Sequence, residues 1–472
     1  MARIITGARG IGRVLVEDGF KYQFNRQSQS TMHWRCWRTT CGAKLKTNLF
    51  DRNDEDPNVR VVEREQHDHE EDDAVIQKGI FLNDAKGSVR DDPTRPIKRV
   101  YDQHVSAIHR EAGGSDQEIP DFQSVRSQMS RVKSAEVPDT PQDIDDVNIE
   151  GSWARSWRNK RFLLHQDNDW GIAIFGTRRN LCALDQCQQL YMDATFRTAP
   201  RPYEQVFTIL GEYYGRVLPL AIVLMTNRAI GHYRQVLQVL QRKIRRATGS
   251  EWEPEAIVCD FEQALITAIQ TELPNTRIEG CYFHFNQSLW RHVKDLGLTR
   301  AYRNHERVKK LIRKVMSIGF LPTAIVRNNF ALLRTENRTR RLFRRYPGLV
   351  EFFNYVFNNY INGNFPVTLW NVYDRDMDCR TNNNAEGFHR AWNNRVQVRH
   401  PNLWIFIRHL KDLQAQTNQG IRSMDNGGQP TRRRRRWQRL ENQLQRLKTD
   451  YINGVRDVQR YWNAVSYLVT TF

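Results

Sequence analysis

The order of the apolar segments between residues 189 and 285 constrains the fold most strongly. Three strand-like runs come first, and then two helical patterns alternate with two further strand-like runs. The first helical pattern ends in a glycine and the second stops at Pro274, as helices commonly do. The order β-β-β-α-β-α-β predicts an α/β fold, a mixed sheet with helices on both faces. The fifth strand is expected to be "RIEGCYFHF".

The flanking sequence divides the chain into four parts. Residues 1–73 are predicted to form a small β-rich module, and residues 74–180 a helical and linker region. Residues 181–398 should hold the mixed sheet, with a basic helical insertion at about 288–370. Residues 399–472 are predicted to form a basic helical region.

Three acidic residues are candidates for one metal site. Asp193 follows "LYM" and Asp260 follows "AIVC", so both stand at strand ends, where ligands gather in such sheets. Glu386 lies near the start of a predicted helix, which Asn384 could cap. Three converging carboxylates would repel one another unless a cation lay between them, and oxygen ligands suit Mg²⁺ or Mn²⁺. Taken singly, each acid has a second interpretation, as a helix cap or a helix-start residue.

Cys281 and His284 form a Cys-x-x-His pair at the end of the fifth expected strand. Two ligands are too few for a structural zinc site. His284 could contact a phosphate or orient a carboxylate of the metal site, and it is a candidate catalytic residue. Packing with one hydrogen bond is the alternative.

Four residues near the N-terminus are candidate zinc ligands. Cys36 and Cys41 are followed by His67 and His69, and two thiolates with two imidazoles suit a closed tetrahedral site. If the histidines alternate on a strand, both point to the same face. The alternative is a pair of incidental thiols near an acidic loop. Only seven cysteines are present, an odd number, which argues against a disulfide framework.

The charge of the chain predicts a polyanionic partner. Its 472 residues have a formal net charge of +19. Residues 299–345 hold fourteen Lys and Arg against two Glu, either a solvated face or a surface that follows a DNA backbone. The run "RRRRR" at 432–436 suits a nuclear localisation signal or a phosphate-binding patch. No apolar run is long enough to span a bilayer and no signal peptide is visible, so we expect a soluble, intracellular protein.

The N-terminal module resembles a known family. "FKYQF", "MHWRCWRTTCGAKL" and "HDH" are similar to a FLYWCH-type zinc finger, with aromatic residues Phe20, Tyr22, Phe24 and Trp34 at matching positions. The resemblance implies a structural zinc ion and binding to DNA or protein.

A second resemblance covers about 210 residues. "YMDATFRTAPRPYEQVFTILG", "AIVCDFEQALITAI", "GCYFHFNQSLWRHVKDLGL" and "TNNNAEGFHRAWN" resemble, in order, blocks of the transposase domain of Mutator-like elements. This resemblance implies a ribonuclease-H-like fold and an Asp-Asp-Glu triad, here Asp193, Asp260 and Glu386. Two Mg²⁺ or Mn²⁺ ions bound there would activate water or a DNA 3′-hydroxyl for phosphodiester cleavage and joining.

These features together predict a nuclear DNA transposase, or a protein derived from one. Its expected partners are transposon ends, target DNA and, in a homo-oligomer, further copies of itself. The alternative is a domesticated, non-catalytic zinc-finger DNA-binding regulator that keeps the fold.

Overall fold

The structure is a computed structural model, and two compact units make up the chain, Met1–Asp139 and Thr140–Phe472. It describes residues 2–6, 13–51, 58–111, 119–375, 383–430 and 435–468. Within these ranges, the side chains of Thr6, Arg13, Glu111, Asn383, Asn384, Glu386, Arg436 and Trp437 are not described. The five-arginine run therefore lies largely outside the described residues.

The first unit begins with a six-stranded sheet in which each strand pairs antiparallel with the next. Side chains that alternate along its strands form a small core around Trp34, which is fully buried. The strands are β1 (Arg3–Thr6), β2 (Arg13–Glu17), β3 (Phe20–Gln27), β4 (Thr31–Cys36), β5 (Lys44–Asn48) and β6 (Val61–Arg64).

The expectation that His67 and His69 alternate on a strand is wrong. Strand β6 ends at Arg64, and both histidines lie in the segment that leads to the first helix. Asp72, which precedes that helix, is buried and donates its backbone N–H to Gly19. This contact holds the end of the segment against the β2–β3 turn.

Three helices follow in the described part of the first unit. They are α1 (Asp73–Asp91), α2 (Ile97–Glu111) and α3 (Phe122–Ala135). Phe81, Val100 and Met129, one from each helix, are buried together in a core of their own.

The second unit contains a mixed sheet with the strand order β13-β12-β9-β10-β11-β8-β7. β12 runs parallel to both β9 and β13, and the other neighbours are antiparallel. The strands are β7 (Leu163–Asp167), β8 (Ile172–Phe175), β9 (Gln189–Thr195), β10 (Gln205–Tyr213), β11 (Arg216–Met225), β12 (Ala256–Cys259) and β13 (Arg277–Gly280). The predicted mixed α/β sheet is confirmed.

The sheet begins earlier in the chain than the boundary expected at residue 181. β7 and β8 form a hairpin whose second strand pairs with β11, so they extend the sheet at that edge. All four residues of β8 are buried, and so short an apolar run shows no alternation that would mark it as a strand.

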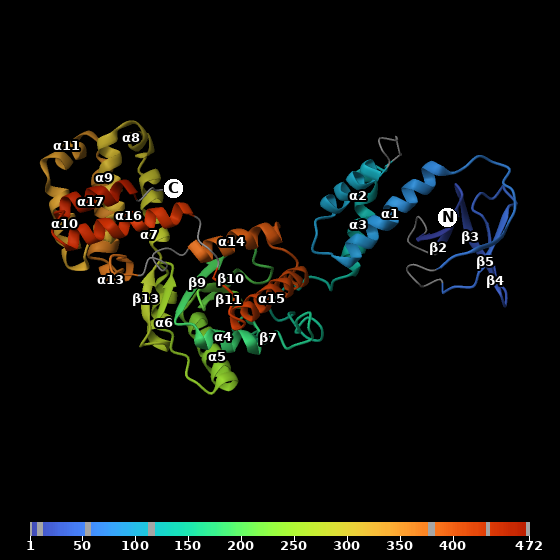
Figure 1. Cartoon of the computed structure of the whole chain (residues 1–472), viewed down its shortest axis with the longest axis horizontal. Helices are drawn as coiled ribbons and strands as arrows, with labels where there is room; N and C mark the ends of the chain where they lie inside the picture. The colour runs from blue at the N-terminus through green and yellow to red at the C-terminus, as the bar shows by residue number, and fades with distance from the viewer. Residues whose placement is uncertain are drawn as a thin grey trace. The chain divides into compact units, whose positions relative to one another are not determined.

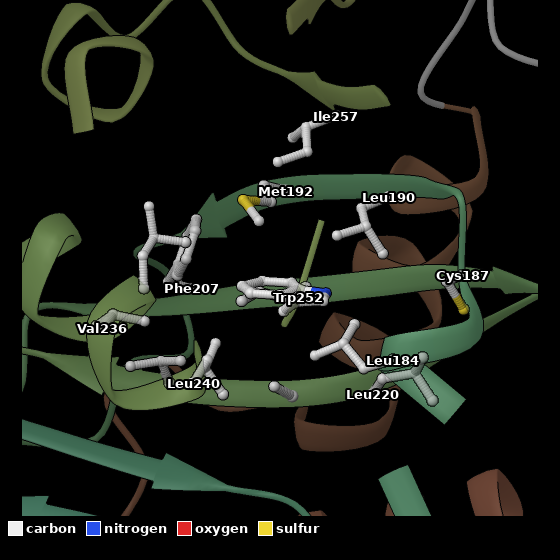
Figure 2. Close-up of a cluster of buried hydrophobic side chains, with 14 of the residues drawn as sticks. Leu184, Cys187, Leu190, Met192, Phe207, Leu220, Val236, Leu240, Trp252 and Ile257 are labelled. Carbon is white, nitrogen blue, oxygen red and sulfur yellow. The ribbon is translucent and has the colours of Figure 1, made fainter. Parts of the chain in front are cut away.

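Helices α4 (Arg178–Gln186), α5 (Ile230–Thr248) and α6 (Gln263–Glu272) cover one face of this sheet. Figure 2 shows Trp252 in the middle of this core, among Leu190 and Met192 of β9 and residues of the covering helices. The glycine expected to end α5 is Gly249, which takes the left-handed backbone conformation with φ of 85°.

The segment "RIEGCYFHF" is a strand only in its first four residues. Helix α7 (Tyr282–Asp295) begins two residues after Gly280, so His284 lies in its first turn and not on a strand. The physical reason is periodicity: Tyr282, Phe285 and Leu289 recur at helical spacing, and all three are buried in a second core.

That second core belongs to a helical bundle formed by two separate parts of the sequence. The first part comprises α7, α8 (Thr299–Asn304), α9 (Glu306–Met316), η1 (Ile318–Phe320), α10 (Thr323–Thr335), α11 (Asn337–Arg345), α12 (Gly348–Val356), η2 (Phe357–Ile361) and α13 (Val367–Trp370). The second part comprises α16 (Arg435–Ile452) and α17 (Val458–Leu468), which supply Leu444, Tyr461 and Trp462. Figure 1 shows these two helices among α9 and α10.

Between the two parts of the bundle, the chain returns to the sheet. Helix α14 (Asn383–Val396) contacts β9, and α15 (Leu403–Asp425) contacts β11 and α4. Ala385 of α14 is buried with Tyr191 and Val258, which alternate with the side chains facing α5 and α6. Helix α14 therefore covers the opposite face. Across the described part of the chain, no helix is both long and apolar enough to cross a membrane.

Candidate functional site

Four potential metal ligands converge beside the first sheet. Cys36 ends β4, Cys41 follows it in a short turn, and His67 and His69 come from the segment after β6. One ligand atom from each lies within 4.8 Å of the others, and both cysteines are buried. The structure therefore brings together all four predicted zinc ligands.

Hydrogen bonds fix how the two imidazoles face the cysteines. The outer nitrogen of His67, Nε2, lies 2.8 Å from the Tyr22 hydroxyl, while its Nδ1 lies 3.5 Å from Cys41 Sγ. The outer nitrogen of His69, Nδ1, lies 2.7 Å from the carbonyl oxygen of Glu70, while its Nε2 lies 3.3 Å from Cys36 Sγ. A partner on the outer nitrogen is the usual way to orient a metal-binding histidine.

The distances among these atoms fit a tetrahedral zinc ion. Zinc with Zn–S near 2.3 Å and Zn–N near 2.05 Å would separate ligand atoms by about 3.6 Å for S···N and about 3.3 Å for N···N. The two S···N distances are 3.3 and 3.5 Å, and His67 Nδ1 lies 3.2 Å from His69 Nε2. The Cys/His group thus supports a structural Zn²⁺.

A second group of polar residues lies at the edge of the mixed sheet. Met192 of β9 is in register with Cys259 of β12, and these two strands are parallel. An aspartate follows each of these residues, Asp193 within β9 and Asp260 directly after β12, so the two aspartates are neighbours. Both line a cavity of about 280 Å³, into which α5 and α6 also contribute.

Asp193 is nearly buried and both of its carboxylate oxygens are held. Oδ1 accepts a hydrogen bond from the Ala194 N–H at 2.8 Å, and Oδ2 lies 3.2 Å from His389 Nε2 on α14. Burial raises the pKa of Asp193, but His389, then His284 and the Ala194 N–H outweigh it, so the pKa lies below its ordinary value. The carboxylate form is therefore favoured despite burial.

His284 lies beside the second aspartate. Its Nδ1 is 3.5 Å from Asp260 Oδ1, which also accepts the Phe261 N–H at 2.6 Å. Burial lowers the pKa of His284, but contact with Cys281 and the charges of Asp260 and Asp193 raise it to about 10. Cys281, fully buried, precedes the helix that carries this histidine.

The cavity holds a third described carboxylate that sequence reasoning missed. Glu262 stands just before α6, and its Oε2 accepts a hydrogen bond from the Tyr233 hydroxyl at 3.1 Å. Burial raises the pKa of Glu262, and the charges of the two aspartates add to that rise against the opposing effects of Tyr233 and Arg228. Arg228, also in the lining, has its guanidinium 5.0 Å from the ring centre of Phe196.

The sequence analysis did not predict His389. For Glu386, the structure describes the backbone alone. The side chain of Glu386 lies outside the described residues, but its backbone belongs to α14. Position 386 of this helix is three residues before His389, which contacts Asp193. The spacing Glu-x-x-His was visible in the sequence, but nothing there showed which strand the helix would face.

Two family models match the chain. Residues 4–69 match the FLYWCH zinc finger domain, and residues 189–288 match the MULE transposase domain. The first range contains all four Cys and His ligands, and the second contains Asp193, Asp260 and His284. No curated protein matches the sequence. The chain therefore carries a FLYWCH zinc finger domain and a MULE transposase domain, as the sequence predicted, and this pair supports a transposase-related, DNA-binding protein.

Proposed function

We propose that the chain is a DNA transposase, or a protein derived from one, that cuts and joins phosphodiesters at the acidic cavity. Asp193, Asp260 and Glu386 would form its metal-binding triad, within a ribonuclease-H-like fold. The zinc finger would bind DNA and the protein would act in the nucleus.

One observation carries the proposal. Asp193 of β9 and Asp260, directly after β12, lie at the ends of two parallel strands and line one cavity, and His389 of α14 contacts Asp193. Ligand sites in sheets of this kind form beyond the carboxyl ends of parallel strands. The helix that carries Glu386 packs against β9, which supports a role for this residue as the third acid of the proposed triad.

The residues present suit hard divalent cations. Asp193, Asp260 and Glu262 offer carboxylate oxygens to the same cavity, the ligand type that Mg²⁺ and Mn²⁺ prefer. When bound, such ions would supply Lewis-acid activation of a water or a 3′-hydroxyl and charge stabilisation on the leaving oxygen.

The protein's own groups would keep this cavity ready for a charged substrate. His389 and the Ala194 N–H fix the orientation of the Asp193 carboxylate before any ligand arrives. His284 offers a second cationic or hydrogen-bonding group beside Asp260. In our proposal it orients Asp260 or contacts the scissile phosphate.

The test is cleavage of the DNA that flanks the protein's own gene, using the whole chain with Mg²⁺ or Mn²⁺. We expect wild-type protein to cut this DNA and Asp260→Asn to lose cutting by at least 10²-fold while it still binds, because one metal-binding carboxylate is gone. Equal cutting by both proteins would remove Asp260 from the mechanism. Binding without cutting by either would favour the alternative, a non-catalytic DNA-binding regulator.

A further inference from the structure

Helix α11, at residues 337–345, carries an unusual density of positive charge. Five of its nine residues are arginine: Arg338, Arg340, Arg341, Arg344 and Arg345. All five are exposed. At about 100° per residue, they and Asn337 spread over an arc of about 160° on one side of the helix.

The other side of α11 is fixed to the bundle. Thr339 is buried, and Leu342 and Phe343 pack against the bundle core. The helix contacts α10 and α12, and it lies at the outer edge of the bundle, away from the sheet (Figure 1). The arginine side therefore faces outward on a rigid support.

Close ion pairs do not balance these charges. Glu336 directly precedes α11, but among the residues that the structure describes no carboxylate lies within 4.0 Å of the five guanidinium groups. Arg340 and Arg344, and likewise Arg341 and Arg345, are one turn apart and repel each other. An anionic partner bound along the helix would relieve this repulsion.

The surface is also hollowed. A groove of about 630 Å³ is lined by Asn337, Arg340, Arg341, Phe343 and Arg344. Guanidinium groups present paired donors that match phosphate oxygens, and the asparagine adds a neutral polar group. The groove is built from α11 alone and shares no lining residue with the acidic cavity.

We propose that α11 is a contact surface for the phosphate backbone of double-stranded DNA, separate from the acidic cavity. The choice of DNA over another polyanion rests on the proposed function. A helix of nine residues is about 13.5 Å long, so several consecutive phosphates can lie along its arginines. Binding of this kind reads charge and not sequence.

The test measures binding of the full chain to a 30-base-pair duplex of arbitrary sequence, in EDTA so that cutting plays no part. The variant is Arg340→Gln with Arg344→Gln. The matched control is Arg242→Gln with Arg246→Gln, two exposed arginines one turn apart on α5. We expect the α11 variant to bind roughly tenfold weaker per lost contact at 0.1 M salt, with the salt slope reduced by about 1.8, and the α5 control to bind like wild type.

One further variant serves as a rescue. Arg340→Lys with Arg344→Lys should restore most of the binding, because the charges return. Because binding is measured in EDTA, failure of this surface is distinguished from failure of cutting at the cavity. Equal affinities and slopes for the α11 and α5 variants would overturn the proposal. The proposal would also be overturned if the α11 variant lost binding to single-stranded RNA or polyglutamate but kept its binding to the duplex.

Discussion

At the scale of single residues, His67 and His69 turn different ring nitrogens toward the cysteines because their neighbours differ. His67 turns Nδ1 toward the cysteines because Tyr22 holds Nε2, and its ring stacks on Phe20 with 3.8 Å between ring centres. His69 turns Nε2 toward them because the Glu70 carbonyl holds Nδ1. The outer contacts thus decide which nitrogen is presented.

Glu262 gives a prediction at this scale. Glu262→Gln keeps an acceptor for Tyr233 but removes one of three described negative charges from the cavity. We expect the variant to need about tenfold more Mg²⁺ for half-maximal DNA cutting, since groups next to metal ligands commonly change affinity by that amount.

The control for this prediction is Glu255→Gln, an exposed residue before the opposite end of β12. It should leave the Mg²⁺ requirement unchanged. An unaltered requirement in Glu262→Gln, measured by titrating Mg²⁺ in the cleavage assay, would show that Glu262 does not contribute to the cavity's affinity for cations.

Asp193 and Asp260 were predictable from the sequence because each position follows from the apolar residues just before it. A carboxylate directly after a buried apolar run marks a strand end whatever the partner strand is. His389 and Glu262 lack such a mark, because each acquires its role only when its helix docks. The zinc ligands were predicted from residue type and number, although the strand expected to carry the histidines ends before them.

At the scale of elements, α15 is joined to the sheet by its last residue. Asp425 accepts a hydrogen bond from the Tyr213 hydroxyl of β10 at 2.7 Å, and its other oxygen lies 2.5 Å from Arg179 Nη2 of α4. The Tyr213 bond, and then Arg179, hold the pKa of Asp425 below its ordinary value of 3.8. One carboxylate therefore connects a helix, a strand and a second helix.

Asp425→Asn should make the second unit less stable in a pH-dependent way. A lowered pKa in the folded state stabilises the protein above pH 3.8, and this contribution is lost as the pH falls below that value. Because the site is about a third exposed, we expect a loss of about 1 kcal/mol at pH 7, or about 2 °C in Tm.

Thermal melting from pH 3 to pH 7 checks this, with the exposed Asp169→Asn as the control in the same unit. The difference between Asp425→Asn and wild type should shrink below about pH 4. A difference that stayed constant across the range would mean that the charge of Asp425 does not contribute.

The order of strands and helices around the aspartates was predictable because long apolar segments separated by Gly and Pro carry strong local signals. The point at which β13 ends and α7 begins was not predictable from the sequence. The segment "GCYFHF" is apolar apart from His284, and a short apolar run does not distinguish a strand from a buried helix. The packing of Tyr282 and Phe285 into the bundle core favours the helix.

At the scale of the whole molecule, the two units have separate cores and separate candidate metal ligands. The first unit has small apolar clusters around its sheet and its helices, and the second has the large cores of the sheet and the bundle. Small cores commonly need a metal to remain folded. Zinc should therefore matter to the first unit alone.

Removal of zinc gives the corresponding prediction. The purified chain should contain one zinc ion per molecule, and 1,10-phenanthroline should abolish the thermal transition of the first unit while that of the second stays. Cys41→Ser should have the same effect without chelator, whereas Cys182→Ser, on α4, should not. Metal analysis and scanning calorimetry provide both measurements, and a full zinc content in Cys41→Ser would contradict the assignment.

The bundle has a consequence for how the chain is made. The indole N–H of Trp462 donates to the Lys314 carbonyl at 2.9 Å, and the Tyr461 hydroxyl donates to that of Phe320 at 2.9 Å. During synthesis, α9 and its neighbours leave the ribosome well over a hundred residues before the helices that cover them. These later helices cannot cover the apolar surface of α9 and its neighbours during that time, so chaperones have an opportunity to bind there.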